Sequence, residues 1–282
     1  MMKITICGGG SLGHICIGVF SQCPDVEVSL LTRRPECWSS EIAVTDVNGK
    51  VMTGRLKRVS ASAAEVIPAA DIVLFCLPGF LIEETLLQIK PYLSASAAVG
   101  TVVSSTGFFY MAHKVLAADV QLFGFQRAPF IARVKDYGRT ANLLGYKSSL
   151  AIACENVPDQ ETFRQQVERL FATPVTLLNS YLEASLTNSN PILHTGRLYC
   201  MWCEWAGEAL PQPVHFYQEW DEKSAQMLID MDQEFLQLLH VLPIDQHAIP
   251  SLLEYYESHD ASSLALKLAH ILAFRDIATP MR

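Results

Sequence analysis

Short apolar segments alternate with amphipathic ones over the first 180 residues of the chain. Apolar runs of about four to eight residues, bounded by Gly, Pro, Asp or Ser, are typical of buried strands, and apolar residues that recur three and four positions apart are typical of helices. Strands are expected at Lys3–Cys7, Val26–Leu31, Asp71–Leu77, Ala97–Val103, Val120–Phe125, Ser149–Cys154 and Val175–Leu178. Helices are expected at Leu12–Phe20, Ile82–Leu93 and Phe108–Ala118, and around Phe163–Phe171 with Asp159 as its cap.

The hydrophobic pattern changes after Leu178, where the strand signals stop. Two helical stripes follow, one over Met227–Leu239 and the other over Leu264–Leu272, and such stripes form a core more often than a cofactor site. Strands that alternate with helices favour a mostly parallel sheet with helices on both faces. The fold class is therefore expected to be α/β, with a sheet domain at residues 1–180 and an all-helical domain at residues 181–282.

The turn after the first expected strand is rich in glycine and fits the G-x-G-x-x-G pattern. It reads Gly8-Gly9-Gly10-Ser11-Leu12-Gly13. The pattern is weak alone, but here it lies between a strand and an apolar helix. Gly8 permits the tight turn, Gly10 lets the backbone approach a pyrophosphate, and Gly13 lets the helix pack close to the strand. The helix that opens at Ser11 and Leu12 would bind the phosphates at its N-terminus. The motif predicts a Rossmann-type dinucleotide-binding domain; the alternative is a glycine-rich turn without a ligand.

The end of the second strand indicates which dinucleotide binds. An NAD-binding domain usually carries Asp or Glu about 20 residues after the glycines, where the carboxylate holds the ribose hydroxyls. This chain has Thr32-Arg33-Arg34 there, and two guanidinium groups could clasp a 2′-phosphate. The cofactor is therefore expected to be NADP(H) rather than NAD(H), unless the arginines are simply solvated. Leu77-Pro78, at the carboxyl edge of the same sheet, is expected beside the cofactor.

A histidine near the start of a helix is the main candidate for catalysis. Asn190 is a good N-cap and Pro191 suits the first helical position, so the helix is expected to begin there. His194 then lies about one turn into the helix, where the positive end of the helix dipole favours the neutral imidazole. A neutral histidine can accept a proton at physiological pH, as oxidation of an alcohol or amine requires. The plainer alternative is a capped helix with a polar histidine on its surface.

Composition narrows the range of partners. The 282 residues carry a formal net charge of −8, which argues against nucleic acid, because phosphate binding needs a basic surface. No apolar run is long enough to span a membrane, and the N-terminal sequence has no signal-peptide pattern. The eight cysteines are expected to be reduced thiols of a cytoplasmic protein. Cys200 and Cys203 share a helix face, and they are expected to pack rather than to hold a metal or act in redox chemistry.

Together, these motifs resemble those of the opine dehydrogenases, the octopine/nopaline dehydrogenase family. The resemblance extends along nearly the whole chain, and the Asn-Pro-x-x-His motif is its most specific part. The matching segments are the glycine fingerprint, Leu77-Pro78, Ala128-Pro129-Phe130-Ile131-Ala132-Arg133, Asn190-Pro191-Ile192-Leu193-His194, Phe216-Tyr217 and Asp232-Gln233-Glu234. The resemblance implies a Rossmann domain followed by a helical domain, and a homodimer by analogy.

The family resembled here joins an α-keto acid to the amino group of an amino acid with NAD(P)H as the reductant, and its motif histidine is the catalytic acid/base. On this chain that residue would be His194, and Asn190 would either orient substrate or cap the helix. Arg133 would bind a substrate carboxylate or form a structural ion pair, and Tyr217 would contact substrate or simply pack. The resemblance thus implies an NAD(P)-dependent oxidoreductase with small-molecule substrates.

Two features depart from the family pattern. Thr195 stands where a proline typically follows the histidine. The family's Arg-Tyr-x-x-Glu-Asp segment, whose acidic residue pairs with the histidine and whose arginine holds substrate, would begin about where the printed sequence ends. By type, Arg275 is a substitute for that arginine, and Asp276 or Glu183 for the acid. A histidine without a carboxylate partner loses orientation.

Two alternative functions therefore stay open. One is a ketopantoate reductase-like ketone reductase, although that family uses a lysine and a glutamate and the helix after Asn190 has no lysine. The other is a catalytically silent NADP(H)-binding or redox-sensing protein.

Overall fold

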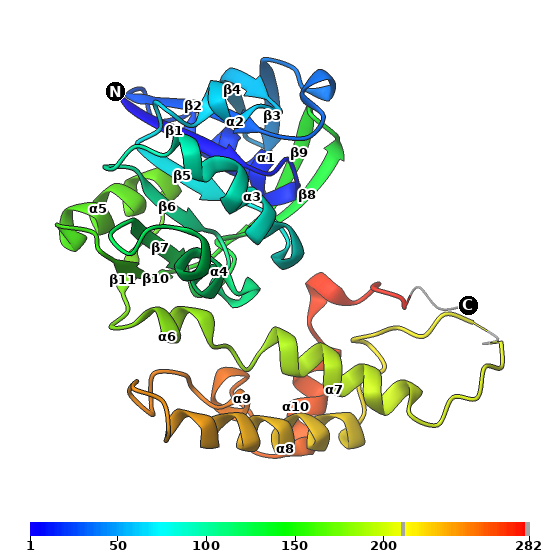
Figure 1. Ribbon diagram of the computed structural model, residues 1–282. Helices are drawn as coiled ribbons and strands as arrows, with labels where there is room; N and C mark the ends of the chain where they lie inside the picture. Colours follow the sequence, from blue (N-terminus) through cyan, green and yellow to red (C-terminus); the bar gives the residue numbers. More distant parts are fainter. Residues whose placement is uncertain (210–211, 280–282) are drawn as a thin grey trace. The chain divides into compact units, whose positions relative to one another are not determined.

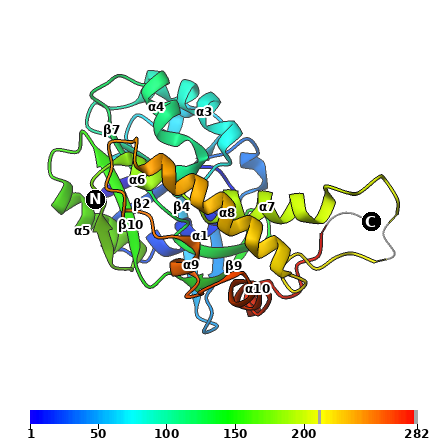
Figure 2. The same ribbon diagram turned by 90° about the horizontal axis from the view of Figure 1, so that it is seen from below.

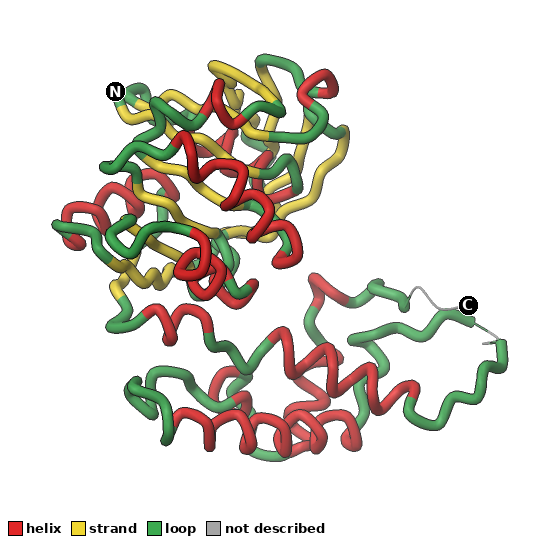
Figure 3. Tube along the Cα trace, viewed as in Figure 1, coloured by secondary structure: helices red, strands yellow, loops and turns green. Residues whose placement is uncertain are grey.

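The computed structural model describes residues 1–209 and 212–279, which divide into two compact units (Figure 1). The first unit runs from Met1 to Leu186, and the second begins at Thr187. Figure 3 shows the strands within the first unit, whereas the described part of the second consists of helices, loops and an isolated β-bridge between His215 and Ala278. The fold is therefore α/β with a helical domain after it, as the hydrophobic pattern predicts.

The first unit is built on a sheet with the strand order β11-β10-β7-β6-β5-β1-β2-β4-β3-β9-β8. From β7 to β4 in that order every pair is parallel, whereas β3–β4, β7–β10 and β8–β9 are antiparallel. The strands are β1 Met2–Cys7, β2 Val26–Leu31, β3 Glu41–Thr45, β4 Val51–Ser60, β5 Ile72–Phe75, β6 Ala98–Thr101, β7 Gln121–Phe125, β8 Phe130–Asp136, β9 Thr140–Tyr146, β10 Leu150–Glu155 and β11 Val175–Leu177. The strand order switches direction at β1, and such a switch point is where open α/β sheets bind ligands.

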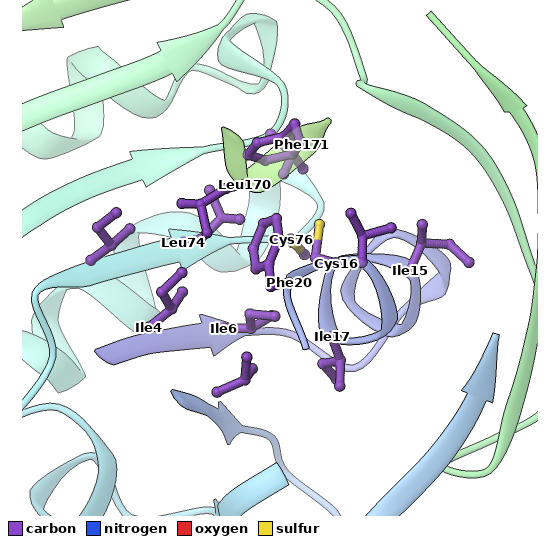
Figure 4. Packing of buried hydrophobic residues seen from close by; sticks show 14 of the residues in the cluster. Ile4, Ile6, Ile15, Cys16, Ile17, Phe20, Leu74, Cys76, Leu170 and Phe171 are labelled. Atoms are coloured by element: carbon purple, nitrogen blue, oxygen red, sulfur yellow. The ribbon is translucent and has the colours of Figure 1, made fainter. Parts of the chain in front are cut away.

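Helices cover both faces of this sheet. On one face α1 (Ser11–Phe20) and α5 (Gln160–Phe171) share a core, and Figure 4 shows Phe20, Leu170 and Phe171 of these helices packed around Leu74 and Cys76. On the other face the helices are α2 (Ala63–Val66), α3 (Ile82–Ile89), α4 (Phe108–Val115) and α6 (Tyr181–Ser185). In Figure 2, α3 and α4 lie together on one side of the unit, away from α1 and α5.

The sequence pattern does not predict β3, β4, β8 and β9, which form two hairpins at one edge of the sheet. The β8 strand exposes alternate residues, Ile131, Arg133 and Lys135, so it lacks the apolar run of a buried strand. Glycines in the left-handed region close both hairpins: Gly49 has φ +79° and Gly138 has φ +74°. These hairpins could be predicted from their turn glycines rather than from the hydrophobic pattern.

The second unit packs its helices around a separate core. These are α7 (Asn190–Trp202), α8 (Glu222–Leu239), α9 (Leu252–Tyr255) and α10 (Ala261–Ala269), followed by a 3₁₀ turn at Leu272–Phe274. The predicted stripes are only partly buried. Leu228, Leu239, Leu264 and Leu268 lie in the core, but Leu238, Leu266 and Leu272 are 53%, 60% and 82% exposed. The expectation that these last three leucines form a core is wrong. Each apolar stripe is wider than the face of its helix that packs against other parts of the unit.

Some general features of the described residues bear on function. No helix in residues 1–209 and 212–279 is both long enough and apolar enough to cross a membrane. The eight cysteines are free. Within the same ranges, no group of three or more His, Cys, Asp or Glu side chains is placed to hold a metal ion.

Phe171 joins three parts of the first core, so we expect its replacement to be costly. The centroid of its ring lies 5.0 Å from that of Phe20, 4.6 Å from that of Phe125 and 5.7 Å from that of Phe130. Phe171→Ala should lower the free energy of unfolding, measured by urea denaturation, by about 3–5 kcal/mol. Leu87→Ala, at a position on α3 that is 56% exposed, is the control and should change it by less than about 0.5 kcal/mol. Equal losses in the two variants would contradict this account.

Candidate functional site

The loop between β1 and α1 lines a cavity of about 750 Å³, a volume typical of ligand sites. Gly8 has φ +113°, and a Cβ atom on it would lie 2.5 Å from the carbonyl oxygen of Cys76. A Cβ atom on Gly13 would overlap the carbonyl oxygen of Gly8. A Cβ atom on Gly10, in contrast, would meet no atom within 4 Å. Gly8 and Gly13 are therefore required by the turn itself, whereas Gly10 leaves space free on the cavity side, as a bound pyrophosphate would need.

Most of the predicted cofactor residues line this one cavity. They are Gly8, Gly10, Thr32, Arg33, Arg34, Leu77 and Pro78. The side chains of Ser11 and Leu12 face the protein instead: the Ser11 Oγ accepts a hydrogen bond from the Val134 N–H at 3.3 Å, and Leu12 packs against the core. Lining residues that sequence reasoning missed are Ala61, Phe80, Leu81, Glu84, Thr85, Gln88 and Tyr137.

The two arginines give the cavity a cationic side. Arg33 and Arg34 are exposed, and within the described residues neither forms an ion pair, even with Glu84, which lines the same cavity. The Arg34 guanidinium carbon lies 4.8 Å from the centroid of the Tyr137 ring. Both charges are thus available to an anionic ligand.

A buried histidine supports the glycine loop, and sequence reasoning missed it. His14 is fully buried, and its Nδ1 lies 3.0 Å from the carbonyl oxygen of Gly10. Its Nε2 accepts a hydrogen bond from the Gly138 N–H at 2.9 Å. Burial lowers the pKa of His14. The ring is therefore neutral with its proton on Nδ1, and it connects the glycine loop to the turn between β8 and β9.

In the second unit the predicted helix start is one residue late. Ser189 occupies the N-cap position, Asn190 is the first helical residue and Pro191 follows in the first turn. Pro191 is tolerated there because the N–H groups of the first turn have no partner within the helix. The prediction that Asn190 is the N-cap is therefore wrong. His194 still lies one turn into α7, and it is exposed on one side.

His194 pairs with a tyrosine. Its Nε2 lies 3.1 Å from the Tyr217 hydroxyl oxygen, and its ring centroid lies 5.5 Å from that of Phe216. Burial against these rings lowers the pKa of His194, and a backbone hydrogen bond to Asn190 partly opposes that effect. Burial raises the pKa of Tyr217, so the phenol keeps its proton and can donate it to Nε2. In the described part of the second unit the hydrogen bonds of this ring go to Asn190 and Tyr217 rather than to a carboxylate.

A buried arginine on the same helix holds the segment that carries Tyr217. Arg197 is 3% exposed. Its Nε donates to the Phe216 carbonyl at 3.3 Å, a terminal nitrogen donates to the Glu219 carbonyl at 2.6 Å, and the other pairs with the Asp221 carboxylate at 3.3 Å. The sequence contained a signal for this role, because Arg197 lies on the apolar face of its helix and an arginine is almost never buried unless it is paired.

The remaining predicted residues lie elsewhere. Arg133 is exposed on β8, outside the cavity lining. Glu183 is buried in the first unit, where its carboxylate accepts a hydrogen bond from the Asn179 N–H at 3.1 Å. Arg275 and Asp276 are exposed in the second unit, and neither is among the hydrogen-bond partners of His194 there.

Known proteins resemble this chain along its length. Residues 177–282 match the family model for the NAD/NADP octopine/nopaline dehydrogenase alpha-helical domain. Octopine dehydrogenase of Mizuhopecten yessoensis is 29% identical over 253 residues, a match that covers 83% of this chain and 62% of that protein. Opine dehydrogenase of Haliotis discus hannai is 23% identical over 315 residues, covering 100% of this chain and 77% of that protein. The helical unit thus matches the octopine/nopaline dehydrogenase family model, and the whole chain is similar to opine and octopine dehydrogenases.

The fold is also similar to that of a solved structure. A solved structure of octopine dehydrogenase with NADH and L-arginine matches with a TM-score of 0.87 at 24% sequence identity, covering 100% of this chain and 77% of that one. At this identity the likeness concerns the fold. The order of a sheet unit followed by a helical unit is therefore also that of this solved structure.

The different surroundings of two glycines give a test of the cavity. Gly10→Ala adds a Cβ atom in free space, so we expect the melting temperature to be unchanged and NADPH binding to weaken by about tenfold or more, because the methyl group would occupy space that a bound pyrophosphate needs. Gly13→Ala places a Cβ atom on a backbone oxygen and should destabilise the protein by about 1–3 kcal/mol. Thermal unfolding and titration of NADPH fluorescence measure the two effects. Wild-type NADPH affinity in Gly10→Ala would exclude the glycine loop as the phosphate site.

Proposed function

We propose that this chain is an NAD(P)H-dependent oxidoreductase that joins an α-keto acid to the amino group of an amino acid, with His194 as the acid/base. The observation that carries the proposal is the solvent-exposed imidazole of His194 on α7, whose pKa is lowered by burial and whose Nε2 contacts the Tyr217 hydroxyl. It lies in the helical unit of a family whose relatives are named octopine, opine and tauropine dehydrogenase. We propose these two substrate classes by analogy with those relatives.

We further propose that the cofactor is NADP(H). The glycine loop offers free space at Gly10, and the end of β2 offers Arg33 and Arg34 in place of a carboxylate. A carboxylate there would hold the ribose hydroxyls of NAD(H) and repel a 2′-phosphate, whereas guanidinium groups attract it. When bound, the dinucleotide supplies the hydride. The residues of this chain bind its phosphates and move protons.

The proton balance of the reaction defines the task of His194. Condensation of the keto acid with the amine releases water and gives an imine, and reduction of the imine by hydride consumes one proton. In the reductive direction the protonated imidazole donates that proton to the keto-acid oxygen, which leaves as water, and in the oxidative direction the neutral imidazole accepts it back, a contribution of about 10²–10⁴-fold in rate. The Tyr217 O–H can rotate about its C–O bond and release its hydrogen bond to the His194 Nε2. The Nε2 atom can then bind a substrate proton while the imidazole ring stays in place.

The proposal is tested by turnover of NADPH with pairs of α-keto acids and amino acids. We expect His194→Ala to abolish turnover while the dissociation constant of NADPH stays within about twofold, because the histidine acts in the helical unit and the cofactor cradle lies in the other. Tyr217→Phe should lower kcat by about tenfold, since it removes the hydrogen bond that orients Nε2. Tyr199→Phe is the matched control, because Tyr199 is 61% exposed on the same helix.

Two results would overturn the proposal. Retained activity in His194→Ala would exclude its catalytic role. Tight NADPH binding without turnover of any substrate pair in the wild-type protein would instead favour the silent cofactor-binding alternative.

The lowered pKa of His194 predicts the pH dependence. In the oxidative direction the neutral imidazole accepts a proton, so kcat/KM should fall as the pH drops through the histidine pKa, which burial holds below its ordinary value. In the reductive direction the protonated form donates, so the rate should fall as the pH rises through the same value. Profiles of kcat/KM against pH in both directions measure this. An oxidative inflection above the ordinary histidine pKa of about 6.5 that disappears in His194→Ala would contradict the lowered pKa.

A further inference from the structure

One wall of the cavity comes from outside the glycine motif. It is the turn between β8 and β9, and its residue Tyr137 lines the cavity with Thr32 and Arg34. The Tyr137 hydroxyl lies 3.4 Å from the Thr32 Oγ1, and the guanidinium carbon of Arg34 lies 4.8 Å from the ring centroid. That distance is within the range of a cation–π contact.

Hydrogen bonds fix this turn from two directions. The Gly138 N–H donates to the Nε2 of buried His14 at 2.9 Å, and the Gly138 carbonyl accepts from the Ser39 N–H at 3.1 Å. A Cβ atom on Gly138 would overlap the carbonyl oxygen of Cys37. The turn is thus held between α1 and the segment that follows β2, which is the segment that carries Arg34.

The ring of Tyr137 is also packed on its edges. Its centroid lies 5.5 Å from that of Trp38 and 5.6 Å from that of His14, both in edge-on arrangements. A Cβ atom on Gly9 would lie 2.7 Å from Trp38 and 2.7 Å from the Tyr137 hydroxyl. The middle glycine of the motif therefore makes room for this aromatic cluster, and the ring has a fixed position beside the loop.

We propose that Tyr137 is a specificity-determining residue of the dinucleotide site, which holds the Arg34 guanidinium in place for the 2′-phosphate of NADP(H). The proposal rests on the NADP(H) preference proposed above. A guanidinium that stacks through its face keeps its N–H groups, which lie in its plane, free for phosphate oxygens. An exposed arginine otherwise loses side-chain freedom when it binds. Tyr137 removes part of that cost before the ligand arrives.

The experiment compares 2′,5′-ADP with 5′-AMP, which differ only in the 2′-phosphate, by calorimetric titration of the full chain. Tyr137→Leu should weaken 2′,5′-ADP binding by about 3- to 10-fold and 5′-AMP binding by less than about twofold. Tyr137→Phe keeps the ring and should retain the wild-type preference. The double variant Arg34→Ala/Tyr137→Leu should bind 2′,5′-ADP no more weakly than Arg34→Ala, because the ring acts through that arginine.

Controls separate this effect from damage to the hairpin. Tyr146→Leu changes a 42% exposed tyrosine at the other end of the same hairpin and should leave the affinities for both nucleotides unchanged. Should Tyr137→Leu fail to fold, the lysine variants replace it, because lysine keeps the charge but lacks the planar group that stacks. Arg34→Lys should lose 2′,5′-ADP affinity, whereas Arg33→Lys, at the neighbouring arginine, should largely retain it.

The outcomes distinguish this inference from the proposed cofactor. A loss of 2′,5′-ADP affinity in Arg34→Ala with no change in Tyr137→Leu, or additive losses in the double variant, overturns the role of Tyr137 and leaves the NADP(H) preference standing. Equal weakening of both nucleotides by Tyr137→Leu also overturns it. A wild-type protein that binds 5′-AMP as tightly as 2′,5′-ADP overturns the NADP(H) preference, and the role of Tyr137 with it. None of these measurements depends on turnover.

Discussion

The close packing of the start of α1 against the end of β1 is the constraint on which the first unit depends. Gly13 has no room for a side chain against the Gly8 carbonyl, and this closeness brings the next residue, His14, beneath the loop. A neutral imidazole has one donor and one acceptor. His14 uses the donor on the Gly10 carbonyl and the acceptor on the Gly138 N–H, so one buried side chain connects the glycine loop to a hairpin far along the chain.

That hairpin makes the sheet edge part of the site. Ser11 accepts a hydrogen bond from the Val134 N–H, and Phe130 stacks on Phe171 of α5 at a centroid distance of 5.7 Å. The β8–β9 pair is therefore held to both helices of that face and not only to β3. Because its position is fixed in this way, Tyr137 can serve as a wall of the cavity. The carboxyl edge of the sheet carries the glycine loop, and the added hairpin gives the surface against which Arg34 is placed.

The fold was predictable from sequence where the local signal was strong. The apolar runs and the glycine pattern locate β1, β2 and α1 to within a residue, and the ends of β2 and β5 supply lining residues because parallel strands end at a common edge. The hairpins lacked apolar runs, although Asn48-Gly49 is a turn signal for β3–β4. The roles of His14 and Tyr137 were not predictable, because each depends on partners that only the folded chain brings close. Whether the predicted site residues act as proposed stays a prediction.

The helical unit shows the same dependence on a buried polar group. Transfer of a guanidinium from water to a core is costly unless its donors are satisfied, and Arg197 satisfies them with the Phe216 and Glu219 carbonyls and the Asp221 carboxylate. Those partners bracket Tyr217 in sequence, so the cost of burying the charge is offset only when Tyr217 is held close to α7. The partner that results for His194 is an uncharged phenol. A carboxylate in its place would raise the pKa of His194. The uncharged phenol does not offset the lowering of that pKa by burial, so the imidazole stays neutral and can act as a base near neutral pH.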